Sequence, residues 1–170
     1  MKEMVTKMIS ESNINNIKFS VCMCVYKNDS PEHFDIALES VINQTIVPNE
    51  IVLVVDGPIP KSLETVINVY EKVPFLKVIR LPNNVGHGNA RRIGLENCTN
   101  ELVALMDADD ISVSDRFEKQ LKCFEQDDTL SVVGGNIIEF YESIENTIGV
   151  RKVPSDDYDI KQYLKVRCPF

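Results

Sequence analysis

Three carboxylates lie within four residues at Asp107-Ala108-Asp109-Asp110, directly after an apolar run from Leu102 to Met106. Like charges this close repel one another unless a cation lies among them. Carboxylate oxygens suit Mg²⁺ and Mn²⁺, and such an ion can bridge to a substrate phosphate. The alternative is an acidic turn that caps the following helix, since Asp is a common turn and N-cap residue. The run by itself favours neither interpretation.

The composition is that of a soluble globular protein, with 170 residues, 44% hydrophobic and 26% charged. The length suits one ordinary domain. The formal net charge is −8, which argues against nucleic acid or an anionic membrane surface as a partner, because either needs a positive face. A locally basic pocket for phosphate is still compatible with this charge.

The N-terminal residues give no targeting signal. No apolar stretch is long enough for a transmembrane segment, and the start of the chain lacks the apolar region of a signal peptide. We expect residues 1–17 to form an N-terminal extension or a short amphipathic helix, because four apolar residues have helical spacing: Met4, Val5, Met8 and Ile9.

The five cysteines are scattered along the chain. Cys22 and Cys24 lie two apart in an expected strand, so both side chains point to one face. No second Cys or His pair completes a zinc site, and core packing is the better interpretation. Reduced thiols in the cytoplasm fit this usage.

Strands and helices are expected to alternate. Nearly continuous apolar runs, typical of parallel strands covered on both faces, predict strands at 19–26, 50–55, 76–81 and 101–106. Ser30-Pro31 predicts the start of the first helix. Apolar residues at helical spacing predict further helices around 63–70, 89–97 and 117–124. Later segments predict two strands at 131–141 and 148–153, then a short helix at 157–166.

Four β–α units imply an α/β fold, a doubly wound and mainly parallel sheet flanked by helices, with a short antiparallel addition near the C-terminus. Ligands bind such sheets beyond the carboxyl ends of the strands. Polar features follow four of these ends: Tyr26, Asp56, the loop 83–88 and the run 107–110. Four polar features at one rim favour a ligand site over isolated turns.

Six segments in order form a longer pattern: Val21-Cys22-Met23-Cys24-Val25-Tyr26, Ser40-Val41-Ile42-Asn43-Gln44-Thr45, Ile51-Val52-Leu53-Val54-Val55-Asp56-Gly57, Asn84-Val85-Gly86 with Ala90-Arg91 and Gly94, Leu105-Met106-Asp107-Ala108-Asp109-Asp110, and Arg116-Phe117-Glu118-Lys119-Gln120. The pattern resembles the family 2 glycosyltransferases of the GT-A (Rossmann-like) fold. A lone Asp-x-Asp is weak evidence, but the order and spacing of all six segments are specific. The resemblance extends over residues 18–170, which we expect to be a nucleotide-sugar-binding domain.

The resemblance implies roles for the acidic residues. Asp109 would contact a divalent metal, Mn²⁺ or Mg²⁺, and Asp107 would reach the ribose or the water shell of the metal. Asp110 would cap the next helix or support the site, which we prefer to a third metal ligand. Asp56 would hydrogen-bond the edge of a uracil-type base. Its alternative role is to cap the turn at Gly57-Pro58.

Other residues match positions around the nucleotide. The backbone at Tyr26 would line the base pocket, and its ring would either stack on the nucleotide or pack in the core. Arg91 would direct a positive charge at the diphosphate, whereas Arg92 is expected to be a solvated helix charge. Gly86 would permit close backbone approach or a positive φ.

The activity implied is the inverting, metal-assisted transfer of a sugar from a UDP- or GDP-sugar to a glycan or lipid-linked acceptor. The resemblance implies a role in cell-surface polysaccharide assembly, in the cytoplasm or at the inner face of the membrane, with peripheral membrane association through other parts. The family's base follows an Asn-Pro-Phe-like motif, which Cys168-Pro169-Phe170 matches in two residues. We therefore expect the base beyond residue 170, and weak donor binding with poor turnover without it.

Two other classes stay open. A sugar-1-phosphate nucleotidyltransferase would share the sheet and a metal-binding aspartate, but it would have a Gly-rich basic loop after the first strand, which this sequence lacks. A non-catalytic carbohydrate- or nucleotide-binding module would show no metal-dependent nucleotide binding. A response-regulator receiver domain is disfavoured because the acidic cluster follows the fourth strand.

Overall fold

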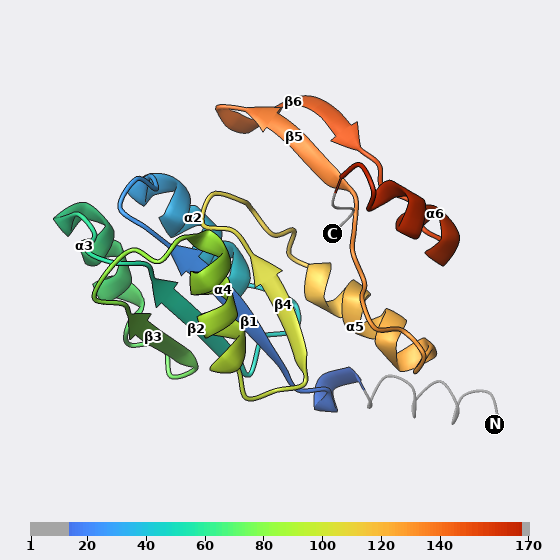
Figure 1. Ribbon diagram of the computed structural model, residues 1–170, viewed down its shortest axis with the longest axis horizontal. Helices are drawn as coiled ribbons and strands as arrows, with labels where there is room; N and C mark the ends of the chain where they lie inside the picture. Colours follow the sequence, from blue (N-terminus) through green and yellow to red (C-terminus); the bar gives the residue numbers. More distant parts are fainter. Residues whose placement is uncertain (1–13, 168–170) are drawn as a thin grey trace. The chain divides into compact units, whose positions relative to one another are not determined.

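The computed structural model describes residues 14–167. The chain divides into two compact units, with the boundary between Leu121 and Lys122, and each unit is described by itself (Figure 1). Most of the expected N-terminal extension, residues 1–13, lies outside the described residues, and Ile14–Asn16 forms a short 3₁₀ turn. Among the described helices, none combines the length and the apolar composition that crossing a bilayer requires.

A four-stranded parallel sheet forms the centre of the first unit. Its strands are β1 (Phe19–Val25), β2 (Glu50–Val55), β3 (Leu76–Arg80) and β4 (Leu102–Met106), in the order β3-β2-β1-β4. The chain adds β2 and β3 on one side of β1 and then crosses to the other side for β4. The strand order therefore reverses between β1 and β4, the position where such sheets bind ligands. The predicted mainly parallel sheet is confirmed.

Helices connect and follow the strands: α2 (Pro31–Ile42), α3 (Lys61–Tyr70), α4 (His87–Glu96) and α5 (Arg116–Gln126). The start of α2 was predicted correctly, since the Ser30 hydroxyl accepts a hydrogen bond from the His33 N–H at 3.2 Å and Pro31 takes the first helical position. Helix α4 begins two residues before the predicted Asn89.

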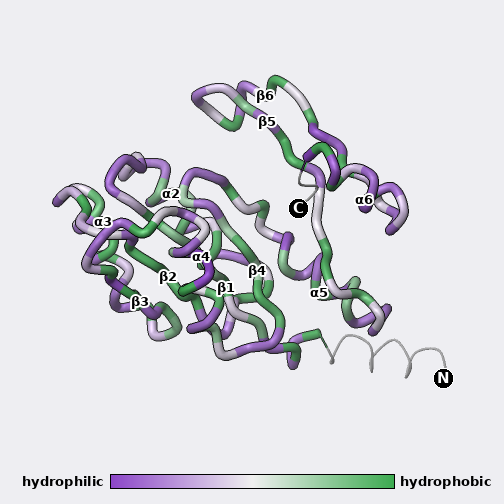
Figure 2. The backbone as a smooth tube through the Cα atoms, viewed as in Figure 1, coloured by the Kyte–Doolittle hydropathy of each residue, from purple (hydrophilic) through white to green (hydrophobic). Residues whose placement is uncertain are grey.

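Both faces of this sheet are covered by apolar side chains. Phe34 of α2, Leu63 of α3 and Phe117 of α5 belong to the larger buried cluster, and the rings of Phe19 and Phe117 meet edge to face at 5.0 Å between centroids. On the other face, α4 packs Ala90 against β2. Figure 2 shows that hydrophobic residues run along the strands of this sheet. Burial on both faces explains why the strand sequences are apolar at nearly every position and do not alternate with polar residues.

Cys22 and Cys24 share one face of β1, as predicted. This face packs against α4, and Cys24 contacts the smaller buried cluster there. A Cβ atom at Gly94 would come within 2.5 Å of the Cys22 sulfur, so α4 approaches β1 closely there. Neither Cys22 nor Cys24 is in a disulfide bond. The thiols of Cys22 and Cys24 fill the space between β1 and α4, which agrees with the core-packing interpretation.

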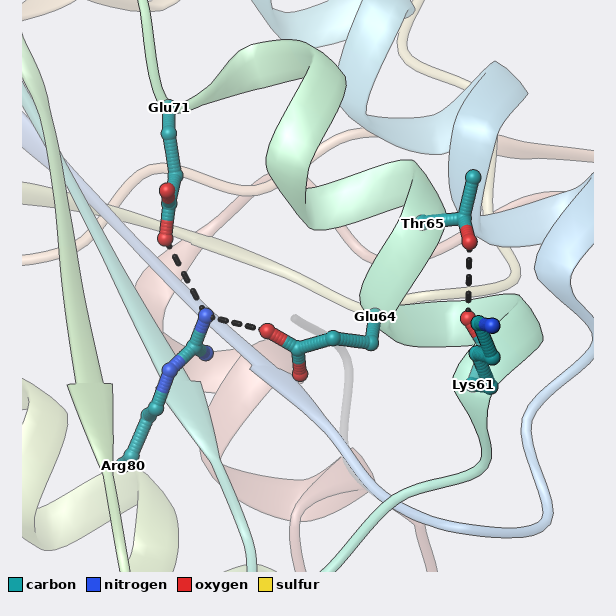
Figure 3. A network of polar contacts seen from close by, with 5 residues as sticks. All are labelled: Lys61, Glu64, Thr65, Glu71 and Arg80. Carbon is teal, nitrogen blue, oxygen red and sulfur yellow. Dashed lines mark hydrogen bonds and ion pairs between the residues drawn. The ribbon is translucent and has the colours of Figure 1, made fainter.

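An ion-pair network joins α3 to the end of β3 (Figure 3). One nitrogen of Arg80 (Nη2) lies 2.6 Å from Glu64 and 3.1 Å from Glu71. Within the helix, the Thr65 hydroxyl donates to the Lys61 carbonyl at 2.8 Å. The charged side chains are between 37% and 49% exposed, so solvent screens the pairs and their contribution to stability is small.

The second unit contains the antiparallel hairpin β5 (Ile137–Tyr141) and β6 (Ser143–Arg151), followed by the short helix α6 (Asp157–Tyr163). The predicted antiparallel addition is confirmed, but its bounds were wrong. Strand β5 begins at Ile137 instead of residue 131, and β6 begins five residues before residue 148. Gly134 and Gly135 precede β5, and glycine weakens strands because it has no side chain to pack.

Candidate functional site

The sequence-predicted residues follow the carboxyl ends of the strands in the first unit. Tyr26 follows β1, Asp56 follows β2, and Asp107 follows β4, while Gly86 precedes α4. These ends share one rim because all four strands are parallel. The acidic run follows β4, which pairs directly with β1. The run therefore lies where the strand order reverses.

Asp107 and Arg91 meet at this rim. The two residues are 16 positions apart, and Nη2 of Arg91 on α4 forms an ion pair with Oδ1 of Asp107. The Arg91 side chain is 20% exposed and that of Asp107 is 49% exposed. The next arginine, Arg92, pairs instead with Glu96 at 2.5 Å on the surface of α4. Only one of the two neighbouring arginines thus faces the acidic run.

Asp56 is buried at 4% exposure and holds the loop that leads into α4. Its carboxylate accepts hydrogen bonds from the Val85 N–H at 2.7 Å and the Gly86 N–H at 3.1 Å, and Asn84 donates to its carbonyl at 3.2 Å. Asp56 therefore fixes this loop, and a backbone hydrogen bond from Gly57 to Val55 closes the following turn. A carboxylate has further acceptor sites, and the expected base contact stays a prediction.

Two glycines make this loop possible. Gly57 has φ +84°, and a Cβ atom there would lie 2.5 Å from the Asn84 nitrogen. Gly86, the residue before α4, has φ +85°. Residues other than glycine rarely adopt a φ in this range, because their Cβ atom is crowded there. The positive φ expected at Gly86 is present, while the close backbone approach occurs at Gly57.

Tyr26 lies at the surface with 40% exposure, so its ring is not part of the core. Its N–H donates to the Asp29 carboxylate at 2.9 Å. Burial raises the pKa of Asp29, and the hydrogen bond from the Tyr26 N–H opposes this shift. The negative charges of Asp109 and Asp107 also raise the pKa, while His87 lowers it. Asp29 therefore belongs electrostatically to the acidic run. The sequence interpretation missed Asp29, although its position three residues after Tyr26 was a signal for it.

Arg116, at the start of α5, contacts the last residues of β4, directly before the acidic run. Its Nη2 donates to the Leu105 carbonyl at 3.0 Å, and its Nη1 lies 3.4 Å from the Met106 sulfur. Burial lowers the pKa of Arg116, and the charges of Asp110 and Asp107 oppose that shift. A mostly buried cation thus lies beside the acidic residues, in a role that the sequence interpretation did not assign.

The side chains of the acidic run decide what kind of metal site it could form. Within residues 14–167, no group of three His, Cys, Asp or Glu side chains is arranged to hold a metal ion. Asp107 and Asp109 are both exposed. Mg²⁺ is commonly held by one or two carboxylates together with substrate phosphates. The residues present therefore fit an ion that binds together with a diphosphate, and they do not fit an ion bound by the protein alone.

Comparison with known proteins identifies the family. The family model described as "Glycosyl transferase family 2" matches residues 20–168. The chain belongs to glycosyl transferase family 2. Over 154 residues this family 2 chain is 40% identical to an uncharacterized glycosyltransferase of Haemophilus influenzae, and over 152 residues 38% identical to the amylovoran biosynthesis glycosyltransferase AmsE of Erwinia amylovora. The matches cover 91% and 89% of the chain but only 58% and 56% of those proteins.

A further relative is the UDP-Gal:alpha-D-GlcNAc-diphosphoundecaprenol beta-1,3-galactosyltransferase of Escherichia coli, 33% identical over 90% of the chain and 55% of that protein. The family 2 chain therefore spans a little over half the length of these relatives.

Solved structures of S. aureus TarS share the fold. The 1–349 structure has a TM-score of 0.59 and 24% identity, covering 82% of the family 2 chain and 39% of that chain. The structure of TarS 1–349 in complex with UDP-GlcNAc has a TM-score of 0.57 and 25% identity. This match covers 65% of the family 2 chain and 32% of the TarS chain. The fold class and the family expected from the sequence are both confirmed.

Proposed function

We propose that this chain forms the donor-binding side of an inverting glycosyltransferase. It would bind a UDP- or GDP-sugar together with Mn²⁺ or Mg²⁺, and the sugar would pass to a glycan or lipid-linked acceptor. The observation that carries this proposal is the meeting of Arg91 with Asp107 beside Asp109, where the strand order reverses. This arrangement offers carboxylates for a cation and a guanidinium for an anion at one place, as a metal–diphosphate complex requires.

Each residue would have a separate task. Asp109 and Asp107 would hold the metal, which when bound neutralises charge on the departing diphosphate. Arg91 would bring a further positive charge to the phosphates. Asp56 and the exposed Tyr26 would flank the nucleoside, since both follow strands next to this rim. Inversion also needs a base that takes the acceptor hydroxyl proton, and we assign that base to none of the described residues.

The relatives support the choice of donor and acceptor. The Escherichia coli relative is named for transfer from UDP-Gal to a diphosphoundecaprenol-linked sugar, and the Erwinia amylovora relative for amylovoran biosynthesis. TarS has been solved with UDP and with UDP-GlcNAc. These names favour a uridine donor and a lipid-linked acceptor. We further propose a role in cell-surface polysaccharide assembly at the cytoplasmic face of the membrane.

Thermal unfolding with nucleotides tests the proposal. We expect UDP or UDP-GlcNAc to raise the melting temperature of the wild type when Mn²⁺ is present, since a ligand that binds only the folded state stabilises it. Mn²⁺ alone should have little effect, because the described residues by themselves offer few ligands. Asp109→Asn should abolish the shift, and Asp128→Asn, a change at another exposed aspartate, should keep it.

Two results would contradict this assignment. An equal shift without metal, or in Asp109→Asn, would show that the acidic run does not hold the metal. The absence of a shift with UDP, GDP and their sugars alike would favour a non-catalytic module.

A further inference from the structure

The buried side chain of Gln44 connects α2 to the segment that follows the acidic run. Gln44 is 6% exposed and lies two residues after the end of α2. Its Nε2 donates to the Ser40 carbonyl and to the Val113 carbonyl, both at 2.8 Å. Its Oε1 accepts a hydrogen bond from the Phe117 N–H at 3.3 Å. The first N–H groups of a helix have no partner inside the helix, so Gln44 also caps α5.

Two neighbouring contacts strengthen the same connection. The Ser40 hydroxyl accepts from the Ser112 N–H at 3.0 Å and donates to the Ala37 carbonyl at 2.7 Å. The Thr45 N–H donates to the Ser114 carbonyl at 2.8 Å. Three consecutive residues, 112–114, are thus held by backbone contacts to the C-terminal end of α2. Their anchored position limits the paths open to the acidic run just before them.

On the other side of the run, Arg116 contacts the strand that leads into it, because its Nη2 donates to the Leu105 carbonyl of β4 at 3.0 Å. The run between these anchors carries exposed carboxylates that repel one another. Without anchors, such a loop would spread its charges apart. Loss of a second-layer contact that orients a metal ligand typically lowers metal affinity by about 10- to 100-fold.

We propose that Gln44 and Ser40 are positioning residues of the metal–diphosphate site. They touch neither nucleotide nor metal, and they act by fixing the loop that carries Asp107 and Asp109. This inference rests on the proposed donor site and extends it to the hydrogen bonds that give the acidic run its shape.

The test uses two variants and one matched control. Gln44→Leu keeps a similar volume but removes the amide, and Ser40→Ala removes the hydroxyl. Ser20→Ala is the control, because it also removes a hydroxyl that accepts a backbone hydrogen bond, here from the Asn100 N–H at 3.3 Å. Ser20 lies near the amino end of β1, away from the rim that carries the acidic run.

The decisive readout is the gain in UDP affinity that Mn²⁺ produces, measured by titration calorimetry at a temperature where each variant is folded. We expect Gln44→Leu to reduce this gain by about 10- to 100-fold and Ser40→Ala to reduce it less, while UDP affinity without metal is unchanged. Ser20→Ala should lose stability but keep the whole gain. A full Mn²⁺ gain in Gln44→Leu and Ser40→Ala would overturn the proposal.

Hydrogen exchange gives a second measurement that needs no ligand. Amides of residues 107–116 should exchange faster in Gln44→Leu and Ser40→Ala than in the wild type, and at the wild-type rate in Ser20→Ala. Unchanged protection in both variants would overturn the positioning role. If the wild type binds no nucleotide, the proposed function fails by itself, and the exchange rates still decide whether Gln44 and Ser40 fix the loop.

Discussion

Arg91 and Asp107 form an ion pair that joins the first turns of α4 to the loop after β4. The guanidinium is mostly covered by protein, whereas the carboxylate is about half exposed. The arginine is therefore held in place while its partner stays accessible from solvent. An anionic ligand at this rim would meet a preplaced positive charge, and a metal ion would meet a carboxylate whose orientation is already set.

Replacing Arg91 should weaken nucleotide binding. A hydrogen bond to a charged group contributes about 1.5–3 kcal/mol, so Arg91→Ala should raise the Kd for UDP with Mn²⁺ by about tenfold or more. Arg92→Ala is the matched control, because Arg92 pairs with Glu96 on the exposed side of the same helix. Titration calorimetry measures both, and equal Kd values for the two variants would remove Arg91 from the site.

The loss of Asp56 should destabilise the first unit. Asp56→Ala removes the acceptor of two backbone N–H groups, those of Val85 and Gly86, and we expect a loss of about 1–3 kcal/mol in the free energy of unfolding. Asp56→Asn keeps one acceptor oxygen and should lose less. Urea unfolding measures the change. Asp35→Ala, at an exposed aspartate, should cost less than Asp56→Ala, and the reverse order would contradict this account.

Three glycine-to-alanine substitutions should change the free energy of unfolding by different amounts, because the backbone conformation differs at the three positions. Gly57→Ala combines a positive φ with a backbone clash and should cost about 2–4 kcal/mol. Gly86→Ala meets open space but keeps a φ of +85°, so strain alone should cost about 1–3 kcal/mol. Gly88 lies inside α4 with neither problem, and Gly88→Ala should stabilise by about 0.5–1 kcal/mol. Thermal or urea unfolding gives this order, and destabilisation by Gly88→Ala would refute it.

Glu50 should make the free energy of unfolding depend on pH in the acidic range. Burial raises the pKa of Glu50, but hydrogen bonds from the Thr99 N–H, the Ser20 hydroxyl and the Thr99 hydroxyl outweigh it, and the net pKa lies below the ordinary 4.5. The unfolded chain therefore takes up the proton first as the pH falls. The stabilisation by Glu50 is complete above that ordinary value and is lost as the pH drops through the lowered one.

Unfolding free energies between about pH 3 and 7 check this dependence. Glu50→Gln should be less stable than the wild type near neutral pH, and the difference should shrink toward about pH 3. Glu101→Gln, at an exposed position, should follow the wild-type profile. A stability difference between the wild type and Glu50→Gln that stays constant across the range would exclude Glu50 as the titrating group.

Local sequence signals were enough for the elements whose cause is local. Ser30 and Pro31 start α2 through contacts within one turn, and apolar runs marked all four parallel strands. The early start predicted for β5 was wrong because Gly134 and Gly135 interrupt an otherwise apolar run. The order of the strands was also outside what local signals contain, since β4 pairs with β1 across more than 80 positions.

Some residues of the candidate site could likewise be predicted from the sequence, and others could not. Residue types and spacing indicated the acidic run, the family resemblance indicated Arg91, and the structure places Arg91 and Asp107 together. Gln44 was seen only as part of a matching segment, because its partners Val113 and Phe117 lie 69 and 73 positions further along the chain. No short window contains both ends of such a contact. Arg116 lies only 11 positions after Leu105, and its role was missed because the residue was read only as part of a matching segment.

The long separation between Gln44 and its partners has a consequence for folding. Contacts that close loops of this length form late, because the entropy of closing the chain must be overcome first. A partly folded first unit with β1, α2 and β2 in place would still lack a shaped acidic loop. We therefore expect donor affinity to appear only after β4 has paired with β1 and α5 has packed against Gln44, so that nucleotide binding would report a fully folded first unit.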